Sequence, residues 1–154
     1  MNPMTDFSNI EYWKAIILYG LNNATYKIAL GKTLLDLSKD VSFSTVSWEL
    51  LSKSFLDNYV DRMSAYTAMP QQANPARLTV MERITIELKA GRLTYADAIA
   101  SVGRNAFNDV IPRFQTIGLD KEIVRIKFYD FQLGKQIQIK DEMYSIAEQD
   151  TSTL

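Results

Sequence analysis

Histidine and cysteine are both absent from this chain of 154 residues. Histidine is the side chain whose unperturbed pKa lies near neutral pH, so its absence excludes the usual general base, any Ser-His-Asp triad and any Cys-His pair. Zinc would have to be bound by carboxylates alone. The catalytic chemistry that remains open uses carboxylate, lysine, tyrosine or carboxylate-bound magnesium.

The absence of cysteine, the scattering of the glycines and the shortness of the apolar runs exclude further structural features and motifs. Without cysteine there is no disulfide framework, which fits a reducing cytoplasm. The six glycines are scattered and form no Walker or dinucleotide-binding loop. The longest apolar runs are only a few residues and the first residues carry no basic segment. The sequence therefore predicts no signal peptide and no membrane contact.

The composition is that of one globular domain. Hydrophobic residues make up 47% and charged residues 23%, and a chain of this size buries roughly 68–70% of its unfolded surface. Seventeen basic residues against eighteen acidic ones leave a net charge of −1. Any contact with nucleic acid would therefore need a local basic patch. We expect a single helical domain over residues 1–147 and a polar tail over 148–154.

Apolar residues recur at spacings of three and four over most of the chain, which predicts helices. The longest such stretch, Glu11 to Leu37, predicts one helix of about seven turns that buries Trp13, although its glycines could instead mark a bend near the middle. A second helix, from Thr45 to Tyr66 and capped by the Ser42–Ser44 stretch, would bury Trp48. After a polar loop, three shorter helices are expected at 79–91, 94–102 and 107–114.

The period changes near the C-terminus. Residues 123–131 alternate between apolar and polar side chains, as a half-buried strand does. Gly134 then suits a turn, and Ile137 and Ile139 alternate on the way back, so a β-hairpin is expected near 123–139. Asp141 would begin a last short helix ending at Ala147. The predicted fold is mainly α: a compact bundle of four to five helices with a small C-terminal β-hairpin.

Acidic motifs provide no convincing active site. Glu87-Leu88-Lys89 would suit a magnesium-dependent nuclease only on a strand, where residues i and i+2 share a face. Here they lie in an expected helix, which favours a solvated helix face. The pairs Asp36/Asp40 and Asp57/Asp61 lack further ligands nearby and are typical of surface charge. We expect no catalytic residue, no metal ligand and no cofactor in this chain.

Basic residues in the C-terminal half are the candidate nucleic-acid contacts. They alternate with aromatic residues, a pattern that can follow a phosphate backbone and stack on bases. The same pattern also describes the solvent face of an amphipathic strand. The candidates are Arg104, Arg113, Arg125 and Lys127, with Lys135 close by, and the aromatic residues are Phe107, Phe114, Phe128, Tyr129 and Phe131.

Two stretches resemble a known protein family. Residues 12–22, YWKAIILYGLN, with ATYK at 24–27, are similar to the opening helix of bacterial proteins that carry a C-terminal HNH endonuclease domain. Residues 106–111, AFNDVI, and the strand around Arg125 are similar to the end of the same N-terminal region. The resemblance extends from about Asn9 to Ile146.

The resemblance implies a non-catalytic module. In that family the ββα-metal nuclease site uses histidines, so none of its catalytic residues has a counterpart here. The chain corresponds to the N-terminal helical region alone, either cut from a longer protein or as a natural stand-alone relative. Such a module would position DNA or a partner for the nuclease domain, or form a homodimer through a stripe of small residues at Gly20, Ala24 and Gly31. The alternatives are a stand-alone interaction or adaptor protein without a nucleic-acid role, and a magnesium enzyme built on carboxylates.

Polar residues inside the resembling segments have two interpretations. Asn22, Tyr26 and Lys27 interrupt an apolar helix, and Asn108 lies in the later segment. They could form a buried structural network with one another or contact nucleic acid. Buried polar groups need partners, so Asn22 and Asn108 are expected to be hydrogen-bonded in either case.

The lack of histidine and the helical setting of Glu87 predict that this chain alone does not cut DNA. Pure protein incubated with supercoiled plasmid and magnesium or manganese should leave the plasmid intact. Cleavage that disappears in Glu87→Ala would contradict this prediction and support the carboxylate enzyme.

Overall fold

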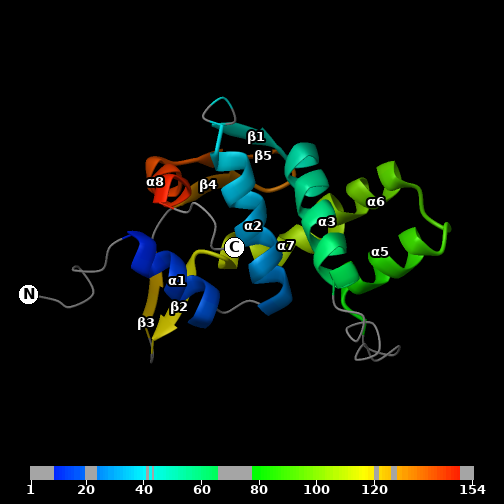
Figure 1. Ribbon diagram of the computed structural model, residues 1–154, viewed down its shortest axis with the longest axis horizontal. Helices are drawn as coiled ribbons and strands as arrows, with labels where there is room; N and C mark the ends of the chain where they lie inside the picture. Colours follow the sequence, from blue (N-terminus) through cyan, green and yellow to red (C-terminus); the bar gives the residue numbers. More distant parts are fainter. Residues whose placement is uncertain are drawn as a thin grey trace, which may run out of the picture.

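The computed structural model describes residues 9–19, 24–40, 42, 44–65, 78–119, 122–125 and 128–149. The fold is mainly α with a small antiparallel sheet that includes a C-terminal hairpin, as the sequence predicts (Figure 1). The helices are α1 (Asn9–Tyr19), α2 (Ala24–Ser38), α3 (Trp48–Ala65), α5 (Val80–Lys89), α6 (Tyr95–Ser101), η4 (Val102–Ala106), α7 (Phe107–Arg113) and α8 (Asp141–Gln149). The strands are β1 (Thr45–Ser47), β2 (Thr116–Leu119), β3 (Glu122–Arg125), β4 (Tyr129–Gln132) and β5 (Gln136–Ile139). Within these residues no helix is long and apolar enough to cross a bilayer.

Two helices, α1 and α2, occupy the stretch for which one long helix was expected. Residues 20–23 between them lie outside the described residues. Both helices pack against α8. A single straight helix could not contact α8 along its whole length. Trp13 of α1 thereby enters the core, where its ring meets Phe114 and Phe128 edge-on at 5.6 and 5.3 Å. Burial of this aromatic ring stabilises the position of α1 against the core.

The expected start of the second helix is wrong by three residues. Thr45–Ser47 form strand β1, which pairs antiparallel with β5, Val46 facing Ile137. The helix cap is Ser47, whose Oγ accepts a hydrogen bond from the Leu50 N–H at 3.1 Å. Pairing with a strand more than 80 residues away is a tertiary effect that overrides the local serine signal.

The predicted hairpin is confirmed as β4–β5, with Gly134 at φ 79° in its turn. The sheet order is β1-β5-β4. The expected single strand over 123–131 is wrong, because it is divided between β3, which pairs with β2, and β4. Phe128 and Tyr129 are both fully buried, and consecutive residues of a regular strand cannot point to the same side.

Gln115 holds the chain at this division. Its side chain is buried, its Oε1 accepts from the Phe128 and Tyr129 N–H groups at 2.9 and 3.2 Å, and its Nε2 donates to the Tyr129 carbonyl at 2.9 Å. The amide thus satisfies backbone groups that would otherwise be buried without a partner.

The three later helices begin and end much as predicted. Thr79 and Glu82 form the expected capping box of α5, Gly91 follows α5 with φ 76°, and Thr94 accepts from the Asp97 N–H at the start of α6. The fourth and fifth expected helices are joined, however. A π-helical turn, η4, connects α6 directly to α7, and Pro112 lies inside α7. The last helix, α8, begins at Asp141 and continues two residues past the expected end at Ala147.

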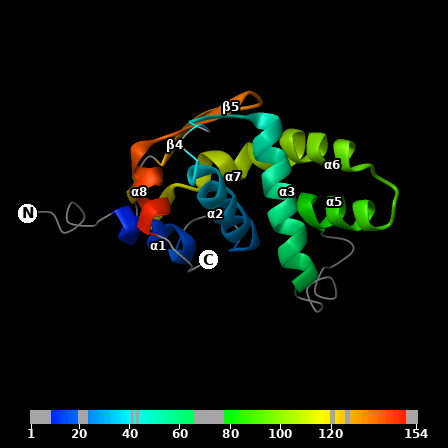
Figure 2. The same cartoon turned by 45° about the horizontal axis from the view of Figure 1, so that its top comes forward.

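The core extends along α3 and the η4–α7 segment. Phe55 of α3 meets Phe107 of α7 at 5.2 Å, and Tyr129 donates to the Ile111 carbonyl from a fully buried position. In both views the α5–α6 pair lies on the side of α3 away from α8 (Figures 1 and 2). The α6–η4 segment runs beside the start of α3. A surface cleft lies between these two segments.

Replacing Trp13 with alanine should lower the free energy of unfolding by roughly 3–5 kcal/mol, because the cavity would lie between two aromatic rings. Urea unfolding followed by circular dichroism measures it. Lys14→Ala is the matched control, because Lys14 is the exposed neighbour on the same helix. An unchanged midpoint in Trp13→Ala would mean that Trp13 is not a core residue.

Candidate functional site

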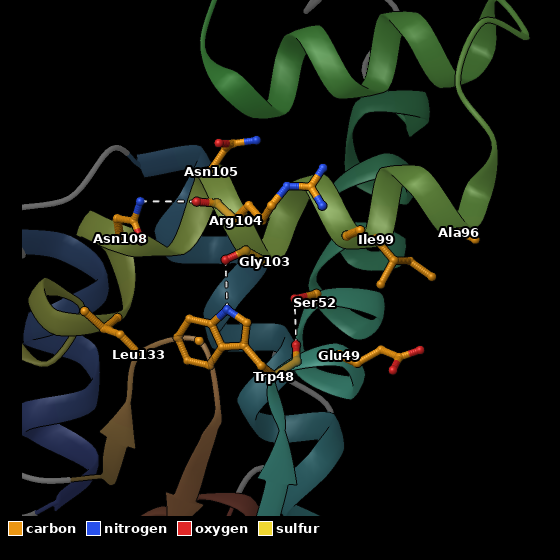
Figure 3. Close-up of a pocket in the computed structure, with 12 residues that line it drawn as sticks. Trp48, Glu49, Ser52, Ala96, Ile99, Gly103, Arg104, Asn105, Asn108 and Leu133 are labelled. Carbon is orange, nitrogen blue, oxygen red and sulfur yellow. Dashed lines mark hydrogen bonds between the residues drawn. The ribbon is translucent and has the colours of Figure 1, made fainter.

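A cleft of about 920 Å³ lies between the start of α3, the α6–η4 segment and the β4–β5 turn (Figure 3). Its apolar lining consists of Trp48, Ala96, Ile99, Ala100 and Leu133. Its polar lining consists of Glu49, Ser52, Arg104, Asn105 and Asn108, and Gly103 and Gly134 complete it. The cleft thus combines apolar surface with amide and charged groups, which is the usual make-up of a binding site.

Trp48 forms the floor of the cleft and joins its walls. Its indole Nε1–H donates to the Gly103 carbonyl of η4 at 2.8 Å, and its ring packs edge-on against Phe107 at 5.2 Å. A π-turn displaces carbonyls from the regular α-helical ladder, and this bond gives one of them a partner. Ser52 donates to the Trp48 carbonyl at 2.6 Å, so the base of the cleft is fixed by short hydrogen bonds.

Gly103 allows η4 to approach α3 closely. A Cβ at this position would lie 3.0 Å from Ser52 Oγ and 3.1 Å from Trp48 Cδ1. Both distances are shorter than ordinary van der Waals contact. A glycine inside a helical pattern is the sequence signal that could have indicated this close approach.

The rim of the cleft is polar and open to solvent. Arg104, Asn105 and Asn108 are exposed. Asn105 Nδ2 donates to Ser101 Oγ and Asn108 Nδ2 donates to the Arg104 carbonyl, both at 3.2 Å. These bonds orient the two amides while leaving their Oδ1 acceptors available. Leu133, at the tip of the β4–β5 turn, is 51% exposed.

The structure brings only part of the predicted nucleic-acid set to this cleft. Arg104 lines it, whereas Arg113 is exposed at the end of α7. Arg125 belongs to β3, but its side chain, like the whole of Lys127, lies outside the described residues. No shared basic surface among the four is therefore established.

The aromatic half of that pattern is corrected by the structure. Four of the five aromatic residues named with the basic set are fully buried, namely Phe107, Phe114, Phe128 and Tyr129. A buried ring cannot stack on a base. Phe131, 37% exposed, is the remaining one. The alternation that suggested stacking arises from core packing.

The predicted polar network falls partly outside the described residues, because Asn22 is not among them. Tyr26 Oη accepts from the Met81 N–H at 3.1 Å, and its ring packs on Phe55 and Tyr59. Lys27 is 5% exposed, and burial lowers its pKa. Asn108 is hydrogen-bonded as expected but is exposed on the cleft rim, because its neighbour Phe107 takes the inward position of the helix.

The acidic motifs lie on helix surfaces, as expected. Glu87 accepts from Arg92 Nε at 2.7 Å, and this hydrogen bond holds the pKa of Glu87 below its usual value. Asp36 and Asp57 pair with Lys32 and Lys53 at 3.1 and 3.5 Å. Across the described ranges no three acidic residues are grouped so that they could hold a metal ion.

Comparisons with known proteins add no relative to this description. Searches of protein-family models, curated proteins and solved structures found no match. The functional argument therefore depends on the cleft and on the chemistry of the chain itself.

Gly103→Ala tests the close contact at the base of the cleft. Overpacking against Ser52 and Trp48 costs about 1–3 kcal/mol, and the helix gains about 1 kcal/mol from losing a glycine. We expect a net decrease of about 1 kcal/mol in the free energy of unfolding, measured with urea. The Ser52→Ala substitution removes Ser52 Oγ, the atom nearest to the added Cβ. The losses of stability in the two single variants should therefore not add up in the double variant. Full additivity, or a Gly103→Ala variant as stable as the original chain, would contradict this packing account.

Proposed function

We propose that this domain is a non-catalytic binding module and that the cleft between α3, α6–η4 and the β4–β5 turn is its binding surface. The observation that carries the proposal is that the exposed Leu133 and the oriented amides of Asn105 and Asn108 line the same cleft. Apolar area that is open to solvent next to fixed hydrogen-bonding groups is the combination that a bound partner would cover.

For the wider protein, we propose the N-terminal region of an HNH-type endonuclease acting in a reducing cytoplasm. The resemblance supports this, because the similar residues 12–27 include Trp13 and Tyr26, which anchor α1 and α2 in the core. Cleavage would belong to a nuclease domain C-terminal to these residues, and this module would position its partner. A stand-alone interaction protein would use the same cleft.

The charges at the cleft favour a protein partner over DNA. Arg104 is its one basic lining residue and Glu49 its one acidic lining residue, so the two charges offset each other. A DNA strand brings one negative charge for about every 3.4 Å of its length. The homodimer stripe receives no support either, because Gly31 is already buried within the chain.

The coding sequence beyond Leu154 tests the assignment to an HNH-type protein. We expect it to continue in frame into a histidine-containing nuclease segment. A stop codon directly after Leu154 would exclude that assignment and leave the stand-alone interaction protein.

A mobility-shift assay tests the choice of partner. We expect no shift of duplex DNA at about 50 mM salt, where electrostatic binding is strongest. A shift abolished by Arg125→Glu with Lys127→Glu, and kept by Arg83→Glu with Lys89→Glu on α5, would instead establish a DNA-positioning role.

A further inference from the structure

We propose that the cleft binds an extended peptide segment of a partner protein, with Asn105 and Asn108 bonding the peptide backbone and one apolar peptide side chain packed against Leu133. The proposal rests on the binding function above and names the class of ligand. Three features of the cleft support it: the two amides, the two charges and the apolar surface.

The two asparagines match a peptide backbone in their hydrogen-bonding chemistry. A side-chain amide offers one acceptor and two donors, so it can bond to both the N–H and the C=O of a peptide group. The bonds to Ser101 and to the Arg104 carbonyl hold both amides in place, which reduces the entropy lost on binding.

The two charges lie on opposite walls of the cleft. Figure 3 shows Arg104 on the η4 side and Glu49 on the α3 side, with Ser52 between them. Both side chains are exposed, and no ion pair connects either one to another described residue. A peptide with an acidic residue near Arg104 and a basic residue near Glu49 would complement both, which would set the direction in which the peptide binds.

The apolar surface lies at the two ends of the cleft, and Leu133 is its more exposed part. Leu133 projects from the β4–β5 turn and Ile99 from α6, and Figure 3 shows them on either side of Trp48. Trp48 itself is only 7% exposed, so it provides a rigid floor rather than a free surface. Covering Leu133 would remove from water the most exposed of the large apolar side chains described.

Other ligands fit these groups less well. A small molecule is usually enclosed over 70–90% of its surface, whereas much of this lining is open to solvent. A nucleic-acid strand would meet a site without net positive charge, and the nearby rings that could stack are buried. An extended peptide needs neither enclosure nor net charge.

The test uses the whole chain and a phage-displayed library of random seven-residue peptides. Selected peptides are synthesised and titrated by fluorescence polarisation. We expect selection of sequences with one large apolar residue flanked by an acidic and a basic residue. Asn105→Ala with Asn108→Ala should weaken binding by about tenfold or more, the loss expected for two hydrogen bonds. Gln132→Ala with Gln138→Ala is the matched control, because these exposed amides lie on the sheet instead.

Exchanging charges between the protein and the peptide tests the site even if a variant is less stable. The same variant should lose binding to one peptide and keep binding to the other. Arg104→Glu should weaken the selected peptide, and replacing the acidic residue of that peptide with lysine should restore binding to Arg104→Glu alone. Leu133→Asp should abolish binding of both peptides.

Three results would overturn the proposal: no enriched sequence, equal binding by the asparagine double variant and the control, or displacement of the peptide by a random single-stranded DNA of similar length. If the peptide proposal fails, the HNH assignment is still decided by the coding sequence. If a stop codon follows Leu154, the peptide proposal is not affected.

Discussion

The hydrogen bond from the Trp48 indole to the Gly103 carbonyl is the contact on which the cleft depends. Trp48 belongs to three parts of the fold at once. Its backbone N–H donates to the Lys135 carbonyl in the β4–β5 turn, it begins α3, and its indole holds the π-turn η4. The sheet, the longest described helix and the α6–α7 segment therefore meet at one residue. Displacing it would separate all three walls of the proposed binding surface.

Gln115 has a comparable role on the other side of the core. Its amide makes three hydrogen bonds to the backbone at Phe128 and Tyr129, so the chain can turn two consecutive aromatic side chains inward there. Trp13 then packs on Phe114 and Phe128. A buried amide with satisfied partners can specify one arrangement in a way that apolar contacts alone do not. The rings of Phe128 and Tyr129 are consequently held in place by hydrogen bonds to their own backbone.

These packing constraints determine which side chains remain at the surface. The proposed function depends on those side chains. The core takes the aromatic residues that a nucleic-acid site would need for stacking, and the π-turn presents Arg104 and Asn105 to the cleft that the exposed Leu133 also lines. Binding through amides and one apolar anchor suits a module that recognises another protein segment. In an HNH-type protein such recognition would bring a partner to the nuclease domain, and in a stand-alone protein it would be the whole activity.

Local signals in the sequence determined the mainly α fold, the capping box at Thr79 and Glu82, the glycine that follows α5 and the β4–β5 hairpin, because each depends on neighbouring residues. The sequence also identified Trp13 and Trp48 as core anchors. It did not reveal the strand at Thr45–Ser47, the division at Phe128 or the cleft. Those were decided by contacts between residues far apart in the chain: β1 with β5, Gln115 with Tyr129, and Trp48 with Gly103. Periodicity shows which face of an element is apolar, but the partner that covers that face is chosen only when the tertiary structure brings the elements together.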